Sequence, residues 1–155
     1  MADSLDDTTV AIFPAQQGAE QVEFTDPKEA VENVGASVDV LCTETCEAQA
    51  VNNDLDPGGS FEIEKAFADV SADDYDALII PGGTVGADDL RADDDAVGLI
   101  GEFAEAGKPM GVIRHAPWTL VEADAVEGRA LTSYPSLQTD TRNAGGEWVK
   151  RGGRR

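Results

Sequence analysis

Short apolar runs alternate along this chain with longer stretches in which apolar residues recur at helical spacing. Apolar runs of about 4–8 residues bounded by turn residues are typical of buried strands, and a spacing of three to four residues is typical of amphipathic helices. The pattern predicts strands at 9–13, 37–42, 77–80 and 109–113, with shorter ones at 61–63, 130–132 and 147–149. It predicts helices at 20–34, 94–106, 116–123 and 136–144, and a capped helical turn at 71–74.

A strand that is followed by a helix and then by another strand indicates an α/β fold with an open, mostly parallel sheet and helices on both faces. The run 77–80 is the most apolar and is expected to be a central strand, whereas 52–60 is rich in turn residues and indicates a loop or hairpin excursion. We expect one domain over 1–155, with an acidic N-terminal tail at 1–8 and a basic C-terminal tail at 150–155.

Three segments are expected to meet where the strands end. They are the loop 14–18, the turn Pro81-Gly82-Gly83, and the stretch 113–115. In open parallel sheets ligands bind outside the carboxyl ends of the strands. The candidate site is therefore this edge of the sheet.

The charge restricts the range of partners. The 155 residues include 31 Asp and Glu against 11 Lys and Arg, a formal net charge of −20. Such a surface repels phosphate backbones and anionic lipids, so we expect no nucleic-acid partner and no membrane partner. The excess of carboxylates also suggests a halophilic protein from a salt-rich cytoplasm, where salt screens their repulsion. The N-terminus lacks a secretory signal pattern, which favours a cytoplasmic location.

Cys42 and Cys46 are the only two cysteines. They are too few for a disulfide framework, and no second ligand pair accompanies them as a zinc site would require. We interpret them as buried or incidental thiols, and a disulfide or redox pair is the alternative. No metal site is predicted.

Several separated segments together resemble the ThiJ/PfpI family, which includes intracellular cysteine peptidase-like and glyoxalase-like proteins. The resemblance covers residues 10–149. It rests on the segments 18–24, 71–83 and 106–109, on the elbow sequence Ile113-Arg-His-Ala-Pro-Trp118, and on 131–136. It implies a flavodoxin-like three-layer sandwich of the glutamine amidotransferase type, with an acidic composition of the haloarchaeal kind.

The resemblance also implies the roles of particular residues. Family members carry a cysteine at a sharp strand-to-helix turn, the nucleophile elbow, and a histidine that corresponds here to His115. A glutamate from the first helix corresponds to Glu23, and backbone amides of Gly82, Gly83 and His115 would form an oxyanion hole. Asp88 is a candidate for an acid that reaches the histidine of a neighbouring subunit, although it also fits a solvated acidic patch. No cofactor is implied.

The chain departs from the family at the elbow itself, where Arg114 replaces the cysteine and Ala116 replaces a glycine. A guanidinium stays protonated and has no lone pair to offer, so Arg114 cannot act as the nucleophile. We expect it to pair with Glu23, through two parallel hydrogen bonds if the geometry allows, and to hold that carboxylate ionised. The alternative is a surface arginine that offsets the acidic field. The methyl group of Ala116 is expected to crowd the turn.

Family members usually continue past 147–149 with a further strand, a turn and a final helix, whereas this sequence stops at Arg155. We therefore expect a C-terminally shortened fold whose exposed edge is covered by another subunit, and hence a homo-oligomer.

Three interpretations of function stay open at this point. The first is a family member without cysteine chemistry that serves in binding, assembly or stress. The second is a working hydrolase or glyoxalase-like enzyme that uses His115 and Glu23 with another nucleophile or water. The third is a small anion-binding module in which Arg114 receives a carboxylate or phosphate.

Overall fold

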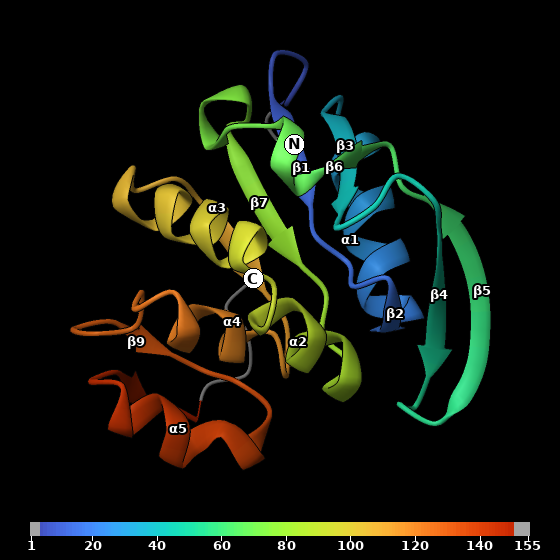
Figure 1. The fold of residues 1–155 in the computed structure, drawn as a ribbon. Helices are drawn as coiled ribbons and strands as arrows, with labels where there is room; N and C mark the ends of the chain where they lie inside the picture. The colour runs from blue at the N-terminus through green and yellow to red at the C-terminus, as the bar shows by residue number, and fades with distance from the viewer. Residues whose placement is uncertain (1–3, 151–155) are drawn as a thin grey trace.

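A central parallel sheet of five strands forms the middle layer of the molecule (Figure 1). The computed structural model describes residues 4–150. The strand order is β6-β3-β1-β7-β8, and every neighbouring pair runs parallel. The strands are β1 (Thr9–Ile12), β3 (Ser37–Cys42), β6 (Lys65–Ala66), β7 (Ala77–Ile80) and β8 (Met110–Val112).

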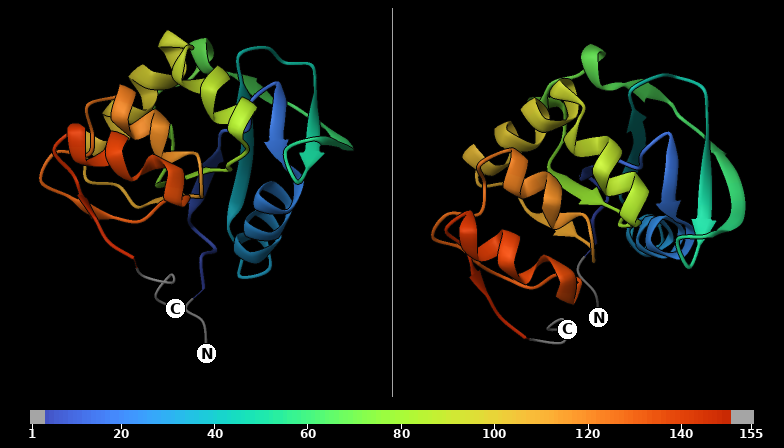
Figure 2. Two further views of the ribbon diagram at one scale, coloured as in Figure 1. Left: turned by 90° about the horizontal axis from the view of Figure 1, so that it is seen from below. Right: turned by 60° about the horizontal axis from the view of Figure 1, so that its bottom comes forward.

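Helices cover both faces of this sheet. Helix α1 lies on one face, and α2, α3 and α4 lie on the other, as Figures 1 and 2 show from three directions. The α-helices are α1 (Gln21–Glu32), α2 (Thr84–Arg91), α3 (Asp94–Glu105), α4 (Pro117–Glu122) and α5 (Gln138–Asn143). Short 3₁₀ turns occur at η1 (Phe67–Asp69), η2 (Ala72–Asp74) and η3 (Pro135–Leu137). No helix within 4–150 has the length and apolar character that crossing a membrane requires.

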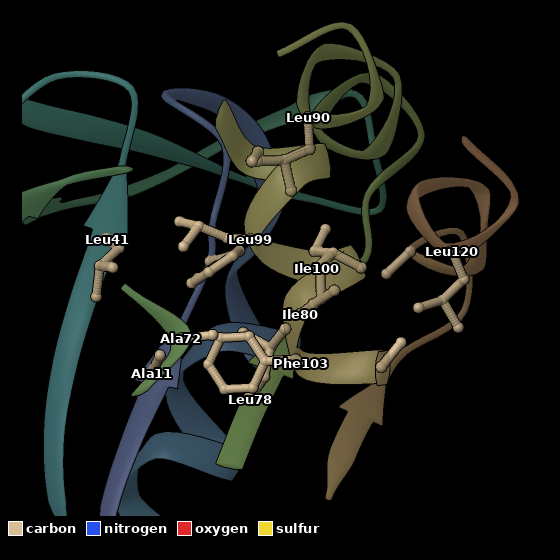
Figure 3. Close-up of a cluster of buried hydrophobic side chains, with 14 of the residues drawn as sticks. Ala11, Leu41, Ala72, Leu78, Ile80, Leu90, Leu99, Ile100, Phe103 and Leu120 are labelled. Carbon is tan, nitrogen blue, oxygen red and sulfur yellow. The ribbon is translucent and has the colours of Figure 1, made fainter. Parts of the chain in front are cut away.

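Strand residues alternate between two hydrophobic clusters, one on each face of the sheet. In β7, Leu78 and Ile80 point to the cluster under α3 and α4, whereas Ile79 joins the cluster under α1. The larger cluster (Figure 3) is centred on aromatic rings, with Phe103 in edge contact with Phe13 at 6.2 Å between centroids. Close packing of this kind holds the strand ends in fixed relative positions.

Two smaller sheets flank the central one. Strand β2 (Gln17–Glu20) pairs with β4 (Glu47–Asn52), which forms an antiparallel hairpin with β5 (Asp56–Glu62). The turn of the hairpin lies at the lower end of the molecule in Figure 1, and it reaches the start of α2 through a hydrogen bond from Thr84 N to Asp54 Oδ1 at 2.7 Å. The second small sheet pairs β9 (Ala130–Leu131) with β10 (Glu147–Trp148).

The mostly parallel α/β sandwich predicted from the sequence is confirmed, and the main strands and helices lie within about two residues of their expected bounds. The segment 52–60 is indeed part of a hairpin. Helix α2 and strands β2, β4 and β6 were not predicted, and the strand expected at 61–63 is the end of β5, which begins at Asp56. Of the predicted N-terminal tail, Leu5 packs on the α1-side cluster and its N–H donates to Val34 O at 2.8 Å, while 1–3 lie outside the described residues. The predicted basic tail at 150–155 also lies outside the described residues, apart from Lys150.

Candidate functional site

The three strand-end segments meet at one edge of the sheet, as the sequence predicted. The N–H of Glu20 donates to the carbonyl of Gly82 at 3.1 Å, which ties the end of β2 to the turn after β7. Gly83 has a φ of +106°, and a side chain there would collide with the carbonyl of Gly18. Glycine is therefore required at this turn, both for its backbone conformation and for the close approach of two backbones.

The turn from β8 to α4 has the sharp geometry of an elbow. Arg114 has a φ of +52°, a left-handed conformation that non-glycine residues adopt infrequently and that concentrates at functional sites. Two backbone hydrogen bonds hold the turn, from Ala116 N to Ile113 O at 2.9 Å and from Tyr134 N to Arg114 O at 2.8 Å. Ala116 itself is fully buried with helical dihedral angles, φ −57° and ψ −26°, so its methyl group is accommodated.

The elbow side chain pairs with the glutamate of the first helix. Nη1 of Arg114 lies 3.1 Å from Oε1 of Glu23, and Oε2 of Glu23 accepts the N–H of Gly82 at 2.7 Å. The predicted ion pair is thus present, but the two carboxylate oxygens face different donors instead of forming a fork with the guanidinium. Glu23 is 7 % exposed, whereas the Arg114 side chain is half exposed.

The pKa of Glu23 is shifted in the direction opposite to the one that an ion pair with Arg114 alone would give. Burial raises the pKa of the Glu23 carboxyl, and this effect outweighs the lowering by Arg114 and by the Gly82 N–H. Arg114 does favour the ionised form, as predicted. Arg114 does not bring the pKa of Glu23 below its ordinary value, because the hydration that the buried carboxylate loses outweighs the stabilisation by one half-exposed guanidinium.

His115 lies buried beside the elbow. Its ring stacks on Tyr134, with 4.4 Å between centroids and 23° between planes, and Nε2 is 3.3 Å from the hydroxyl of Thr84. Burial lowers the pKa of His115, and the Arg114 charge lowers it further against an opposing contribution from Asp54. The imidazole is therefore neutral at pH 7, with one ring nitrogen available to accept a proton.

Asp54 is a site residue that the sequence did not reveal. It lies at the hairpin tip, where Asn53 and Asp54 have φ values of +53° and +63°. Their two N–H groups donate to the buried carboxylate of Glu20 at 2.7 and 3.1 Å, and Oδ1 of Asp54 accepts the N–H of Thr84 at 2.7 Å. The only local signal was the tolerance of Asn and Asp for left-handed conformations in the turn-rich segment.

The predicted oxyanion hole is only partly free. The amide of Gly82 is committed to Glu23, whereas those of Gly83 and His115 have no hydrogen-bond partner within 4–150. Asp88 has a different partner. Its carboxylate is 60 % exposed and pairs with Arg91 at 2.9 Å, so it meets no histidine of its own chain.

Within residues 4–150, neither cysteine forms a hydrogen bond with Glu23, Arg114 or His115. Both thiols are free. Cys42 is fully buried, and burial raises the pKa of its thiol, which lowers the fraction of reactive thiolate. The exposed Cys46 accepts a hydrogen bond from the Gln16 amide at 2.9 Å. Within the described part of the chain, no group of three or more His, Cys, Asp or Glu side chains is arranged to hold a metal ion.

Comparisons with known proteins point to one family. The model of the DJ-1/PfpI family matches residues 8–153. The chain is 37 % identical over 129 residues to YraA of Bacillus subtilis (strain 168), named as a cysteine protease, and the match covers 83 % of this chain and 73 % of that protein. It is 37 % identical over 92 residues to a deglycase of Pyrococcus abyssi (strain GE5 / Orsay), covering 59 % of this chain and 55 % of the relative.

Among solved structures, the fold is similar to a two-domain protein from Anabaena variabilis that contains DJ-1/ThiJ/PfpI-like and ferritin-like domains. The TM-score is 0.85 at 26 % identity, and the match covers 93 % of this chain and 40 % of that one. The ThiJ/PfpI resemblance seen in the sequence is thereby confirmed over most of the chain.

Proposed function

The chain belongs to the DJ-1/PfpI family, and from that premise we propose that its elbow site binds a small ligand without covalent cysteine chemistry. One observation carries the proposal. The side chain at the elbow is a guanidinium, and it lies 3.1 Å from the buried carboxylate of Glu23. A protonated guanidinium has no lone pair, so a carbonyl carbon at this position meets a hydrogen-bond donor where a thiolate would attack it.

Neither remaining thiol is placed to substitute for the elbow cysteine. Cys42 is buried with a raised pKa, and the polar contacts of Cys46 are with Gln16 and the carbonyl of Glu47. A thiol nucleophile needs a lowered pKa or an adjacent base. His115 supplies such a base, but its Nε2 faces the hydroxyl of Thr84.

The test is to restore the family residue. The parent, Arg114→Cys and Arg114→Ser are assayed for methylglyoxal consumption and peptide hydrolysis in molar salt. Arg114→Cys is expected to exceed the parent in kcat/KM by at least about 100-fold in one assay, because only it adds a soft nucleophile beside His115. Arg114→Ser is the matched control, since it also removes the guanidinium but adds no thiol, and it should stay as inactive as the parent.

Turnover by the parent at the rate of Arg114→Cys would contradict the proposal. So would a covalent acyl or hemithioacetal adduct on Cys42 or Cys46, detected by mass spectrometry of the parent during incubation with substrate. His115→Ala then locates the activity, because loss of turnover in that variant assigns it to the elbow.

A second candidate function is hydrolysis with Thr84 as the nucleophile. It is favoured by the 3.3 Å contact between the Thr84 hydroxyl and a neutral imidazole, with the free amides of Gly83 and His115 close by. A hydroxyl next to a base is the arrangement that nucleophilic catalysis uses. It predicts activity in the parent that Thr84→Val abolishes and Thr84→Ser retains.

The proposal also extends to the assembly of the protein and to its location in the cell. We infer that copies of the chain assemble into a homo-oligomer, which multi-angle light scattering in molar salt tests, and a monomer mass would contradict it. A cytoplasmic location remains a prediction. A role in stress remains a prediction.

A further inference from the structure

One edge of the central sheet is open. Strand β8 ends the strand order, and β7 is its only strand partner among the described residues. The N–H of Leu78 in β7 donates to the carbonyl of Pro109 at 3.0 Å. Backbone groups of successive residues face alternate sides of a strand, so those of Met110 and Val112 face away from β7. Within residues 4–150, no further strand and no turn hydrogen bond engages them.

The same two residues of β8 line a groove of about 320 Å³. Its apolar lining comes from Met110 and Val112 of β8, from Leu120 of α4, and from Val126 and Leu131 of the segment that leads into β9. We call the space between these five side chains the β8 groove. An unpaired strand edge beside apolar side chains is what a protein offers when an extended segment of another chain joins its sheet as an additional strand.

Two cations also line the β8 groove, Lys108 and Arg129, and no Asp or Glu lines it among the described residues. Nζ of Lys108 donates to the carbonyls of Ala72 and Tyr75 at 2.7 Å, and Nη2 of Arg129 donates to the carbonyl of Ala104 at 3.3 Å. An ammonium has three N–H donors and a guanidinium has five, so both groups keep unused donors.

Neither cation has a carboxylate partner within residues 4–150. The sequence has 31 Asp and Glu against 11 Lys and Arg, so two unpaired cations at one groove stand out from the rest of the surface. They make the groove locally complementary to a carboxylate.

We propose that the β8 groove binds an extended segment of a partner protein that adds to the sheet as a strand beside β8. Its alternate apolar side chains would fill the groove, and a carboxylate at one end would contact Lys108 and Arg129. None of the groove residues belongs to the elbow network of Glu23, Arg114 and His115, so the inference goes beyond the proposed elbow function and does not depend on it.

Charge and side-chain chemistry favour this occupant over the chain itself. A second copy that paired through its own β8 would bring another Lys108 and Arg129 to the same edge, and like charges oppose that contact. The sequence 151–155 has three arginines and no apolar residue, so it matches neither the cations nor the lining. A segment that combines carboxylates with β-branched side chains matches both, and it also favours the extended conformation.

The first experiment measures binding of the peptide EVTVTE, acetylated and amidated at its ends, to the full chain by isothermal titration calorimetry in molar potassium chloride. A glutamate at each end allows either strand direction to bring one carboxylate to the cations. Replacement of both valines by serine should weaken binding at least about tenfold, because the apolar contact is lost. Replacement of both glutamates by lysine should weaken it about threefold, since molar salt reduces the contribution of an exposed ion pair.

A pair of backbone-methylated peptides tests the strand geometry itself. One peptide is N-methylated at both valines and the other at both threonines, so that the two sets of N–H groups that face opposite sides of a strand are removed separately. One of the two should bind at least about tenfold more weakly than EVTVTE, and the other should stay within about twofold of it. Equal binding of the two methylated peptides would show that no strand is added, and would overturn the inference.

Variants of the chain locate the site. Arg129→Gln should weaken EVTVTE binding about threefold and narrow the difference between the glutamate and lysine peptides. Lys28→Gln is the matched control, because it removes an equal charge on α1, which lies on the other face of the sheet, and it should change neither affinity. Met110→Pro removes an N–H that the fold leaves unpaired, so it should weaken binding at least about threefold. The methylated peptides need no variant, so they decide the question even if Met110→Pro does not fold.

Three outcomes would overturn the inference besides equal binding of the methylated peptides. They are the absence of saturable EVTVTE binding, equal weakening by Arg129→Gln and Lys28→Gln, and a fall in oligomer mass in Met110→Pro while no peptide binds. The last result would assign the β8 edge to an interface between copies. Each of them leaves the elbow proposal as it stands, because the methylglyoxal and peptidase assays of Arg114→Cys use a different site.

Discussion

At the two ends of the central sheet, the pKa of a carboxylate is shifted in opposite directions. At the amino end, Asp39 on β3 accepts hydrogen bonds from Lys65 at 2.6 Å and from the Tyr75 hydroxyl at 2.8 Å. Burial alone would raise the pKa of Asp39, but these two donors outweigh it and the pKa is lowered. At the carboxyl end burial prevails, and the pKa of Glu23 is raised despite the contact with Arg114.

The difference indicates where the fold is optimised for stability and where it is not. The amino end satisfies its charges with ordinary side-chain partners. The carboxyl end combines the buried carboxylates of Glu20 and Glu23 with left-handed conformations at Arg114 and Asp54. Unfavourable groups of this kind persist where the surrounding structure holds them, and they concentrate at functional sites.

Removal of salt should have the largest effect on the stability of the fold. With a net charge of −20, self-repulsion opposes the compact state once screening is lost, so we expect the chain to unfold at low ionic strength. Far-ultraviolet circular dichroism during dialysis from molar to millimolar potassium chloride measures this. A full native spectrum without added salt would show that the halophile hypothesis is wrong.

The next largest effect on stability is expected from a methyl group added at Gly82, at the carboxyl end of the sheet. Gly82→Ala would overlap the Glu23 carboxylate and approach the carbonyl of Ile113, so it should lower the free energy of unfolding by about 3 kcal/mol. Gly111→Ala, in the neighbouring strand, is the matched control, since its methyl group would approach the Ile79 side chain no closer than 3.8 Å.

Urea unfolding in molar salt measures both variants. We expect Gly111→Ala to change the free energy of unfolding by less than about 0.5 kcal/mol. Alanine lowers the conformational entropy of the unfolded chain, and this stabilising effect offsets a small steric cost of the new methyl group in the folded chain. Equal destabilisation by the two substitutions would mean that the contact of Glu23 with Gly82 is not the reason for glycine at this turn.

The sequence was sufficient for the layers of the fold and for the ion pair at the elbow. Strand β7 and helix α3 have strong apolar patterns, and the family resemblance placed Glu23 beside Arg114. Helix α2 was missed because Gly86 weakens its pattern. A side chain at Gly86 would approach the Gly18 carbonyl within 2.8 Å, so a contact between distant segments dictates the glycine. The helix propensity of a segment does not reflect such a contact with a distant segment.

The participation of Asp54 could not be predicted for a related reason. Its position depends on the hairpin, whose tip is held by the carboxylate of Glu20 more than thirty residues away in the sequence. The raised pKa of Glu23 likewise depends on how completely the folded chain removes it from water. Pairing partners can be read from a motif, whereas burial follows only from the packed structure.

A smaller effect should come from the amino end. Tyr75→Phe removes the hydroxyl that donates to the Asp39 carboxylate and should lower the free energy of unfolding by about 1.5 kcal/mol, the value of one hydrogen bond to a charged acceptor. Lys65→Gln should cost less, because an exposed cation contributes little to stability and molar salt screens it further. Urea unfolding in molar salt compares them, and a larger loss in Lys65→Gln would mean that the ion pair dominates this end.

The smallest effect is in the dependence of stability on pH, and its sign should differ between the two ends. The pKa of Glu23 is raised above its ordinary 4.5, so ionisation costs the folded state, and the stability gained from the protonated form is lost as pH rises through the folded pKa. The parent should therefore gain stability relative to Glu23→Gln as pH falls toward 4.5.

Asp39 should behave in the opposite sense. Its pKa is lowered below 3.8, so its contribution is present above that value and is lost as pH falls through the folded pKa. The parent should lose its advantage over Asp39→Asn only below pH 3.8. Urea unfolding at constant ionic strength between neutral and acidic pH measures both differences. Parallel pH profiles for the two variants would remove the distinction between a carboxylate governed by burial and one governed by its partners.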